Sequence, residues 1–151
     1  MSQQLTIEIP IRAIPSSNSK KVGKQGQIYD AHKGKAGQLA TIRLFAAQAA
    51  KDQGWKRTAE PVWMSLEFVM PRPKEHFGTG RNAGKLKSSA PRWCTTKNSD
   101  RTNLLKAVED ALTGIVWDDD SQVVDGPLRK SYGETGLIRI SICELENTLE
   151  N

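Results

Sequence analysis

Paired cysteines, histidine clusters and long hydrophobic runs are all missing from this chain of 151 residues. Its two cysteines, Cys94 and Cys143, form no CxxC pair and stand apart from the two histidines, so neither a disulfide framework nor a zinc site is indicated. No segment is apolar for long enough to span a membrane, and the first ten residues lack the charged start and apolar run of a signal peptide. These absences predict a cytoplasmic protein with no membrane partner.

Acidic residues are scarce outside one short stretch. Residues 100–125 hold seven acids against two bases, whereas the rest of the chain holds 10 acids against 20 bases. The net charge of +5 therefore hides a basic protein that contains one acidic island. Such asymmetry favours a nucleic acid or another phosphate-rich partner.

The periodicity of apolar residues predicts a single α+β domain over residues 1–151. Apolar and polar residues alternate in three stretches, which predicts strands over residues 4–12, 62–70 and 137–145. Helical spacing predicts two main helices, over residues 35–53 and 101–112. Two short pieces are expected to be extended, residues 115–117 and 121–125, and residues 146–151 to be a frayed tail. This order of elements predicts a mixed β-sheet packed with two helices.

The longest stretch without a sustained period covers residues 71–98 and contains three prolines and three glycines. Irregular segments of this length are usually functional or disordered, and this one is basic. We expect its cations to hold the phosphate backbone of a nucleic acid, namely Lys74, Arg81, Lys85, Lys87, Arg92 and Lys97. Lysines of the amino-terminal third are expected to extend this surface, namely Lys20, Lys21, Lys24, Lys33 and Lys35. The alternative for both groups is a solvated charged face.

Two tryptophans accompany the charged segments. Trp117 is expected in the core, because it ends a predicted extended piece beside the acidic turn. Trp93, within the basic loop, is expected either in the core, at a dimer interface, or stacked on a base of open DNA.

Carboxylates gather at the predicted second helix and the turn that follows it. With about 100° of rotation per residue, Asp100, Asn103, Lys106 and Asp110 share one polar stripe beside the apolar face. Asp118, Asp119 and Asp120 then crowd three like charges, which repel one another unless a cation offsets them. Mg²⁺ prefers carboxylate oxygens, paired ions can activate water for phosphodiester cleavage, and a lysine can stabilise the developing phosphate charge.

A simpler interpretation is open for the same residues. Asp100 (or Ser99) could be only the amino-terminal cap of the helix, with Gly114 as its stop. Asp110 would then be a solvated helix residue, and the three consecutive aspartates a polar surface turn. Composition and spacing alone do not separate the two interpretations.

The second half of the chain resembles the RusA family of Holliday-junction resolvases. That family carries a pattern close to K-P-D-x-D-N-L-x-K-A-x-x-D-A-L, then a turn, then W-x-D-D-x-Q-V-V. The matching positions here are Lys97, Asp100, Asn103, Leu104, Lys106, Ala107, Asp110, Ala111, Leu112, Trp117, Asp119, Asp120, Gln122, Val123 and Val124. The segment MPRPKEHFGTGRNAGKLKSSAP also resembles a loop of phage-borne members, and IPIRAIPSSN resembles the family's first strand and turn.

The resemblance implies a homodimeric, Mg²⁺-dependent endonuclease, with Mn²⁺ as a substitute metal, that nicks four-way junctions and related branched DNA in recombination and repair. It implies metal ligation by Asp100 and Asp120, an assisting metal-binding role for Asp119, and Lys106 as the catalytic cation, with Asn103 and Asp110 in support. Its setting would be a bacterium or a phage-infected host.

Two positions depart from the family pattern. Ser99 replaces the usual proline, which changes the entry to the helix. Thr102 stands where the family has its second catalytic aspartate, and a hydroxyl is a weaker ligand for a hard cation. Either Asp119 or Asp110 compensates, activity is lowered, or the protein binds junctions without cutting them. The first outcome is favoured here because the surrounding motif is intact, and a non-catalytic branched-DNA-binding protein is the alternative.

Overall fold

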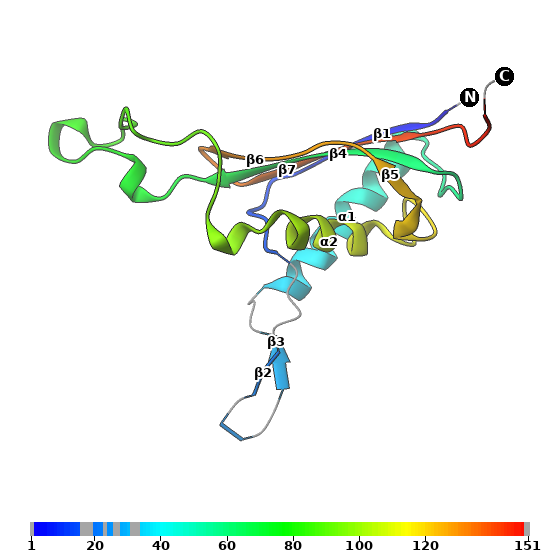
Figure 1. Cartoon of the computed structure of the whole chain (residues 1–151), viewed down its shortest axis with the longest axis horizontal. Coiled ribbons are helices and arrows are strands. Elements are labelled where there is room, and N and C mark those ends of the chain that lie inside the picture. The colour runs from blue at the N-terminus through cyan, green and yellow to red at the C-terminus, as the bar shows by residue number, and fades with distance from the viewer. Residues whose placement is uncertain (1, 16–19, 23, 26–27, 31–33, 150–151) are drawn as a thin grey trace.

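A computed structural model describes residues 2–15, 20–22, 24–25, 28–30 and 34–149 of the chain. Five strands form one mixed sheet, and the helices α1 (Lys35–Gln53) and α2 (Arg101–Leu112) both lie against the same face of it (Figure 1). The predicted α+β fold with two main helices is confirmed, and both helices have the predicted bounds. In the described part of the chain, no helix combines the length and the apolar character needed to cross a membrane.

The sheet is built around one long central strand. β1 (Gln4–Ile9) pairs antiparallel with β7 (Leu137–Glu144), which pairs antiparallel with β4 (Val62–Pro71). The far edge of β4 is covered in succession by β5 (Val123–Asp125) and β6 (Leu128–Gly133), both parallel to it. Because β5 follows directly from the acidic turn, the sheet fixes where that turn lies.

Gly126 joins the two edge strands at a position that no other residue fits. Its φ is 129°, and a Cβ built on it would lie 1.9 Å from the carbonyl oxygen of Met64. The backbone of the edge therefore passes against β4, and Leu66 N–H donates to the Pro127 carbonyl at 2.9 Å. This close approach holds β5 and β6 on one sheet edge despite the break between them.

The core lies between the sheet and the two helices. Alternate residues of the strands are buried, as the period of two predicts, and the helices contribute Ile42, Ala46, Leu104 and Val108. Trp117 is fully buried, which confirms its predicted place in the core. Its indole N–H donates to the Thr113 hydroxyl at 3.0 Å, so the end of α2 and the chain beyond it are tied together.

The structure differs from the predictions at several segments. Ile115 and Val116 lie in a turn rather than an extended piece, because Val116 N–H still donates to the Leu112 carbonyl at 3.0 Å. Trp117 makes isolated bridges, to Thr58 and Thr113. The sequence of β6, LRKSYG, has no clear alternation because this edge strand is only partly buried, and it was not predicted. β1 ends at Ile9, three residues earlier than predicted. A second short pairing, β2 (Lys20–Val22) with β3 (Ile28–Asp30), was also not predicted.

Residues 72–98 form an arm that extends past the end of the sheet and then returns to the start of α2 (Figure 1). No long helix or strand forms there, as predicted, although Pro71 belongs to β4. Short 3₁₀ turns order the arm instead: η1 (Lys74–His76), η2 (Gly80–Asn82) and η3 (Lys97–Ser99). Two backbone bonds close its tip, from Gly78 N–H to the Lys85 carbonyl and from Lys87 N–H to the His76 carbonyl, both at 2.9 Å.

Candidate functional site

Helix α2 begins at an aspartate that caps it. One carboxylate oxygen of Asp100, Oδ1, accepts hydrogen bonds from the backbone N–H groups of Thr102 at 2.8 Å and Asn103 at 3.2 Å. These bonds satisfy two of the donors that every helix start leaves unpaired. The capping role proposed from the sequence is therefore confirmed. The cap does not exclude a second role, because Asp100 is exposed and its bonds to described residues use only Oδ1.

The three consecutive aspartates after α2 have three different surroundings. Asp118 forms an ion pair with Arg57, with 2.5 Å between Oδ1 and Nε. Asp119 caps the 3₁₀ turn η4 (Asp120–Gln122), where it accepts bonds from the backbone N–H and the hydroxyl of Ser121. These bonds hold the pKa of the Asp119 carboxyl below its usual value. Among the described residues, the exposed carboxylate of Asp120 has neither a hydrogen-bond nor an ion-pair partner.

Glu109 belongs to the same acidic group, and sequence analysis did not single it out. It is half-buried near the carboxyl end of α2, and its pKa is raised from 4.5 to about 7. Burial is the largest cause, followed by the negative charges of Asp120 and Asp110, while Lys106 opposes them. Its sequence position could have indicated this burial. Glu109 follows Leu105 by four residues, so it lies at the border of the apolar face, where an acidic side chain is partly buried.

Lys106 and Asp110 lie on the exposed stripe of α2, as predicted. Their charged groups are 3.9 Å apart, and both side chains are about half exposed. Such exposed pairs contribute little to stability, so this lysine is available to another anion at small cost. Thr102 is exposed in the first turn of the helix, and Asn103 is half-buried beside it.

The predicted metal ligands lie at opposite ends of α2. Asp100 caps the start of α2, a helix of twelve residues and roughly 18 Å, whereas Asp120 lies near Glu109 toward the other end. In the part of the chain that the structure describes, no group of three or more histidine, cysteine, aspartate or glutamate side chains lies close enough to hold a metal ion. The oxygen ligands suit Mg²⁺ in their chemistry. One chain, however, presents them as two separate acidic groups.

All the cations predicted to contact DNA in residues 71–98 are exposed, and they lie on the arm: Lys74, Arg81, Lys85, Lys87, Arg92 and Lys97. Of the amino-terminal lysines, Lys24 is exposed and Lys35 is half-buried at the start of α1, whereas Lys33 lies outside the described residues. Lys20 and Lys21 belong to β2.

Trp93 is not in the core. Its side chain is 46% exposed where the arm returns to the sheet, and its backbone bridges to Ser131 of β6. The guanidinium of Arg92 lies 4.7 Å from the centre of its ring and that of Arg129 lies 5.9 Å away. An exposed indole with two arginines close to its ring combines a stacking surface with phosphate-binding charge.

Comparison with known proteins places these features in one family. A family model described as endodeoxyribonuclease RusA matches residues 10–143, which is most of the chain. A stretch of 85 residues is 33% identical to the protein named "Uncharacterized protein YqaN" of Bacillus subtilis (strain 168). That stretch covers 56% of this chain and 58% of the relative, so the chain spans little more than half of the length of this curated protein. The chain belongs to the RusA endodeoxyribonuclease family.

Proposed function

We propose that this protein is a Mg²⁺-dependent, structure-specific endonuclease that acts as a homodimer on four-way junctions and related branched DNA, in recombination and repair. The observation that carries the proposal is the pair of acidic groups at the two ends of α2, beside a basic arm. The match to the endodeoxyribonuclease family supports the reaction class.

A symmetric dimer would complete the metal site. If two copies of α2 lie antiparallel about a two-fold axis, Asp100 of each copy meets the opposite helix end of the other. That end carries Glu109 and Asp120, so each site would combine carboxylates of both subunits. The same arrangement would supply acids to the position of Thr102, which Asp110 of its own chain, eight residues along the helix and roughly 12 Å away, does not reach.

The residues of one such site would divide the work of phosphodiester hydrolysis. A Mg²⁺ ion bound there would supply Lewis-acid charge to the phosphate and to the attacking water. Asp100 and Asp120 would hold the ion, and Asp119, fixed by Ser121, would assist. Lys106 would stabilise the charge that develops on the phosphate oxygens. Two symmetric sites would make two matched nicks in a substrate that itself has approximate two-fold symmetry.

The arm would hold the DNA. Its exposed lysines and arginines can neutralise backbone phosphates of any sequence, which gives an affinity that falls steeply with salt. Trp93 stands at the base of this surface, where an unpaired base of an open junction could stack on it.

The alternative is a branched-DNA-binding protein that does not cut. The replacement of the usual second aspartate by Thr102 favours it, because a charged ligand is lost in the first turn of α2. A cleavage assay separates the two functions. Wild type and Asp120→Asn are incubated with a labelled four-way junction or a linear duplex of the same sequence, in Mg²⁺ or in EDTA. Metal-dependent nicking of the junction, lost in Asp120→Asn, is the expected result. Binding without nicking in any metal supports the alternative, and equal binding of linear duplex contradicts both.

A mixed-variant experiment tests the shared site directly. Asp100→Asn and Asp120→Asn are each expected to be inactive as homodimers. In a heterodimer of the two, one shared site has lost both aspartates and the other is intact. Mixing them should therefore restore single nicks at about a quarter of the wild-type rate, if subunits exchange at random. If the mixture stays inactive after co-refolding, the shared site is contradicted. Both aspartates would then belong to a site within one chain, or to no site.

A further inference from the structure

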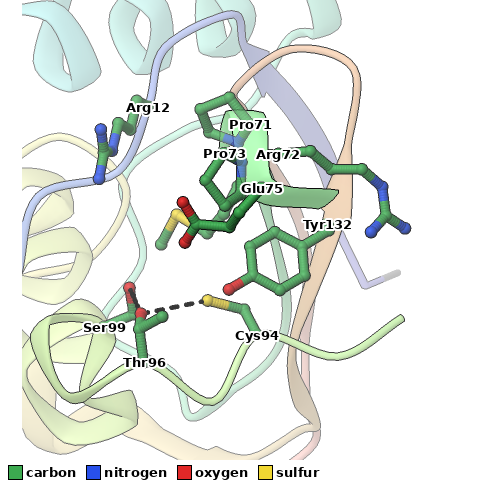
Figure 2. Close-up of a pocket in the computed structure, with 10 residues that line it drawn as sticks. Arg12, Pro71, Arg72, Pro73, Glu75, Cys94, Thr96, Ser99 and Tyr132 are labelled. Atoms are coloured by element: carbon green, nitrogen blue, oxygen red, sulfur yellow. Dashed lines mark hydrogen bonds between the residues drawn. The ribbon is translucent and has the colours of Figure 1, made fainter. Parts of the chain in front are cut away.

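A cavity of about 300 Å³ lies between the base of the arm and the start of α2 (Figure 2). Met70, Pro71 and Pro73 form an apolar wall at the end of β4. The opposite side carries Cys94 and Ser99, and Ser99 immediately precedes the helix-capping Asp100. The cavity therefore adjoins one of the two acidic groups, yet it shares no residue with either.

Hydrogen bonds to neighbouring residues fix the polar groups that line the cavity. Ser99 accepts a bond from the Thr96 hydroxyl at 3.0 Å, and the Thr96 hydroxyl lies 3.5 Å from the Cys94 sulfur. Lys130 fixes the backbone there by donating to the Ser99 carbonyl at 2.6 Å. Burial raises the pKa of the Cys94 thiol, but hydrogen bonding by Thr96 and Tyr132 outweighs it and the net shift is downward. These contacts make the wall a fixed set of donors and acceptors.

Tyr132 presents its hydroxyl to the same space. Its ring is packed edge to face with His76 at 4.7 Å, and the Arg72 guanidinium lies 5.5 Å from its centre. Figure 2 shows the hydroxyl directed toward Cys94 and the Arg72 side chain directed away from the cavity. Burial raises the pKa of the Tyr132 phenol above its usual value, so the hydroxyl keeps its proton and remains a donor at neutral pH.

An acid and a base complete the lining. The Glu75 carboxylate is turned into the cavity on the side of the Cys94 thiol, and Arg12 lies on the wall beside it (Figure 2). A carboxylate here disfavours a phosphate ligand by like-charge repulsion. It suits instead a neutral ligand with an amino group, because a carboxylate accepts bonds from the exocyclic amines of bases.

We propose that this cavity takes up a single unpaired nucleobase that carries an exocyclic amino group, extruded from the DNA next to the phosphate at Asp100. The inference rests on the proposed function and adds a base-reading site to it. Glu75 accepts from the amino group, and the Tyr132 hydroxyl turns its single proton from the Cys94 sulfur to a ring nitrogen or carbonyl of the base. The apolar wall packs against the base. Extrusion costs least where a base is already unpaired, as at the centre of a branch. Thymine, which lacks the amino group, is the base that the cavity excludes.

The test uses the whole protein and junctions that carry 2-aminopurine, one at a time, at positions flanking the branch point. EDTA prevents cleavage, and the anisotropy of a distant label reports total binding. At saturating protein, we expect the 2-aminopurine fluorescence to rise at one position. Glu75→Gln should lower the equilibrium constant for extrusion about tenfold, because a neutral amide oxygen replaces a charged acceptor. Tyr132→Phe should lower it less, and both variants should leave the anisotropy midpoint nearly unchanged. Glu60→Gln, which removes an exposed acid at the opposite end of β4, is the matched control.

The outcomes separate this inference from the proposed function. Saturated anisotropy with a silent fluorophore at every position overturns the base site and leaves the endonuclease standing. The same holds if Glu75→Gln and Glu60→Gln give equal fluorescence, or if thymine at the responsive position supports cleavage as well as an amino-bearing base. No binding of branched DNA overturns both proposals together.

Discussion

Glu109→Gln should stabilise the protein above neutral pH and flatten the pH dependence of its stability. In the folded protein this carboxyl keeps its proton up to about pH 7, whereas in the unfolded chain it ionises near 4.5. Between these values the folded state binds more protons than the unfolded state. The free energy of unfolding therefore falls as pH rises through this window, and the whole loss persists above pH 7.

The size of the effect follows from the raised pKa. At about 1.4 kcal/mol per pH unit, a fully buried carboxyl with this pKa would cost roughly 3.4 kcal/mol. Glu109 is only half-buried and solvent screens its neighbours, so we expect about 1–2 kcal/mol. Glutamine keeps the shape of the side chain and removes the charge. The variant should match wild type at pH 4.5 and exceed it by this amount at pH 8.

Urea unfolding at pH 4.5, 6 and 8 measures the difference between variant and wild type, which cancels the titration of every other group. Glu134→Gln, an exposed acid in the turn between β6 and β7, is the control and should follow wild type throughout. Asp120→Asn should recover part of the gain, because Asp120 is the second cause of the raised pKa. A Glu109→Gln protein that is no more stable than wild type at pH 8 would refute the reasoning. Under the proposed function, added Mg²⁺ at pH 8 should stabilise wild type more than Glu109→Gln.

Three further substitutions test the site. Asp100→Asn keeps an efficient cap, so urea unfolding should be unchanged while junction nicking falls at least about a hundredfold. Asp100→Ala should lose the nicking and also cost about 1 kcal/mol of stability. Equal nicking by Asp100→Asn and wild type would mean that Asp100 only caps the helix. Thr102→Asp restores a charged ligand, so isothermal titration should give tighter Mg²⁺ binding and the assay faster cleavage; no change in either means that Thr102 is no handicap. Trp93→Ala should weaken junction binding about tenfold in anisotropy titrations without changing the slope of log affinity against log salt. Arg129→Ala should reduce that slope by about one, because it removes one phosphate contact. A changed slope in Trp93→Ala would argue against a stacking role.

The helices and central strands were predictable because their signals are local. Helix α2 has an apolar face at helical spacing and a capping aspartate at its start, and its predicted bounds are those observed. β4 alternates buried and half-buried residues over its whole length, so the period of two located it. β6 could not be predicted from a period of two. Pairing with β4 sets its register, and an edge strand needs no apolar alternation of its own.

The candidate site was predictable in composition but not in arrangement. The sequence identified Asp100, Asp119 and Asp120 as candidate ligands in a basic chain, and the family resemblance implied different roles for Asp119 and Asp120. It could not give the surroundings of the three consecutive aspartates. Their surroundings differ only in the folded chain, where Arg57, far away in sequence, forms an ion pair with Asp118 and Ser121 donates hydrogen bonds to Asp119. Whether they act together as metal ligands stays a prediction.

The sequence by itself determined the acidic island, the basic arm and the helix that separates the two acidic groups, since charge and helical period are written locally. The tertiary structure decided how these parts relate to one another. Packing of α2 against the sheet draws Glu109 partly out of water and so raises its pKa. The helix, roughly 18 Å long, keeps Asp100 at one end while Asp120 lies near Glu109 at the other. The physical reason is that burial and separation depend on contacts between distant segments, which no local pattern contains.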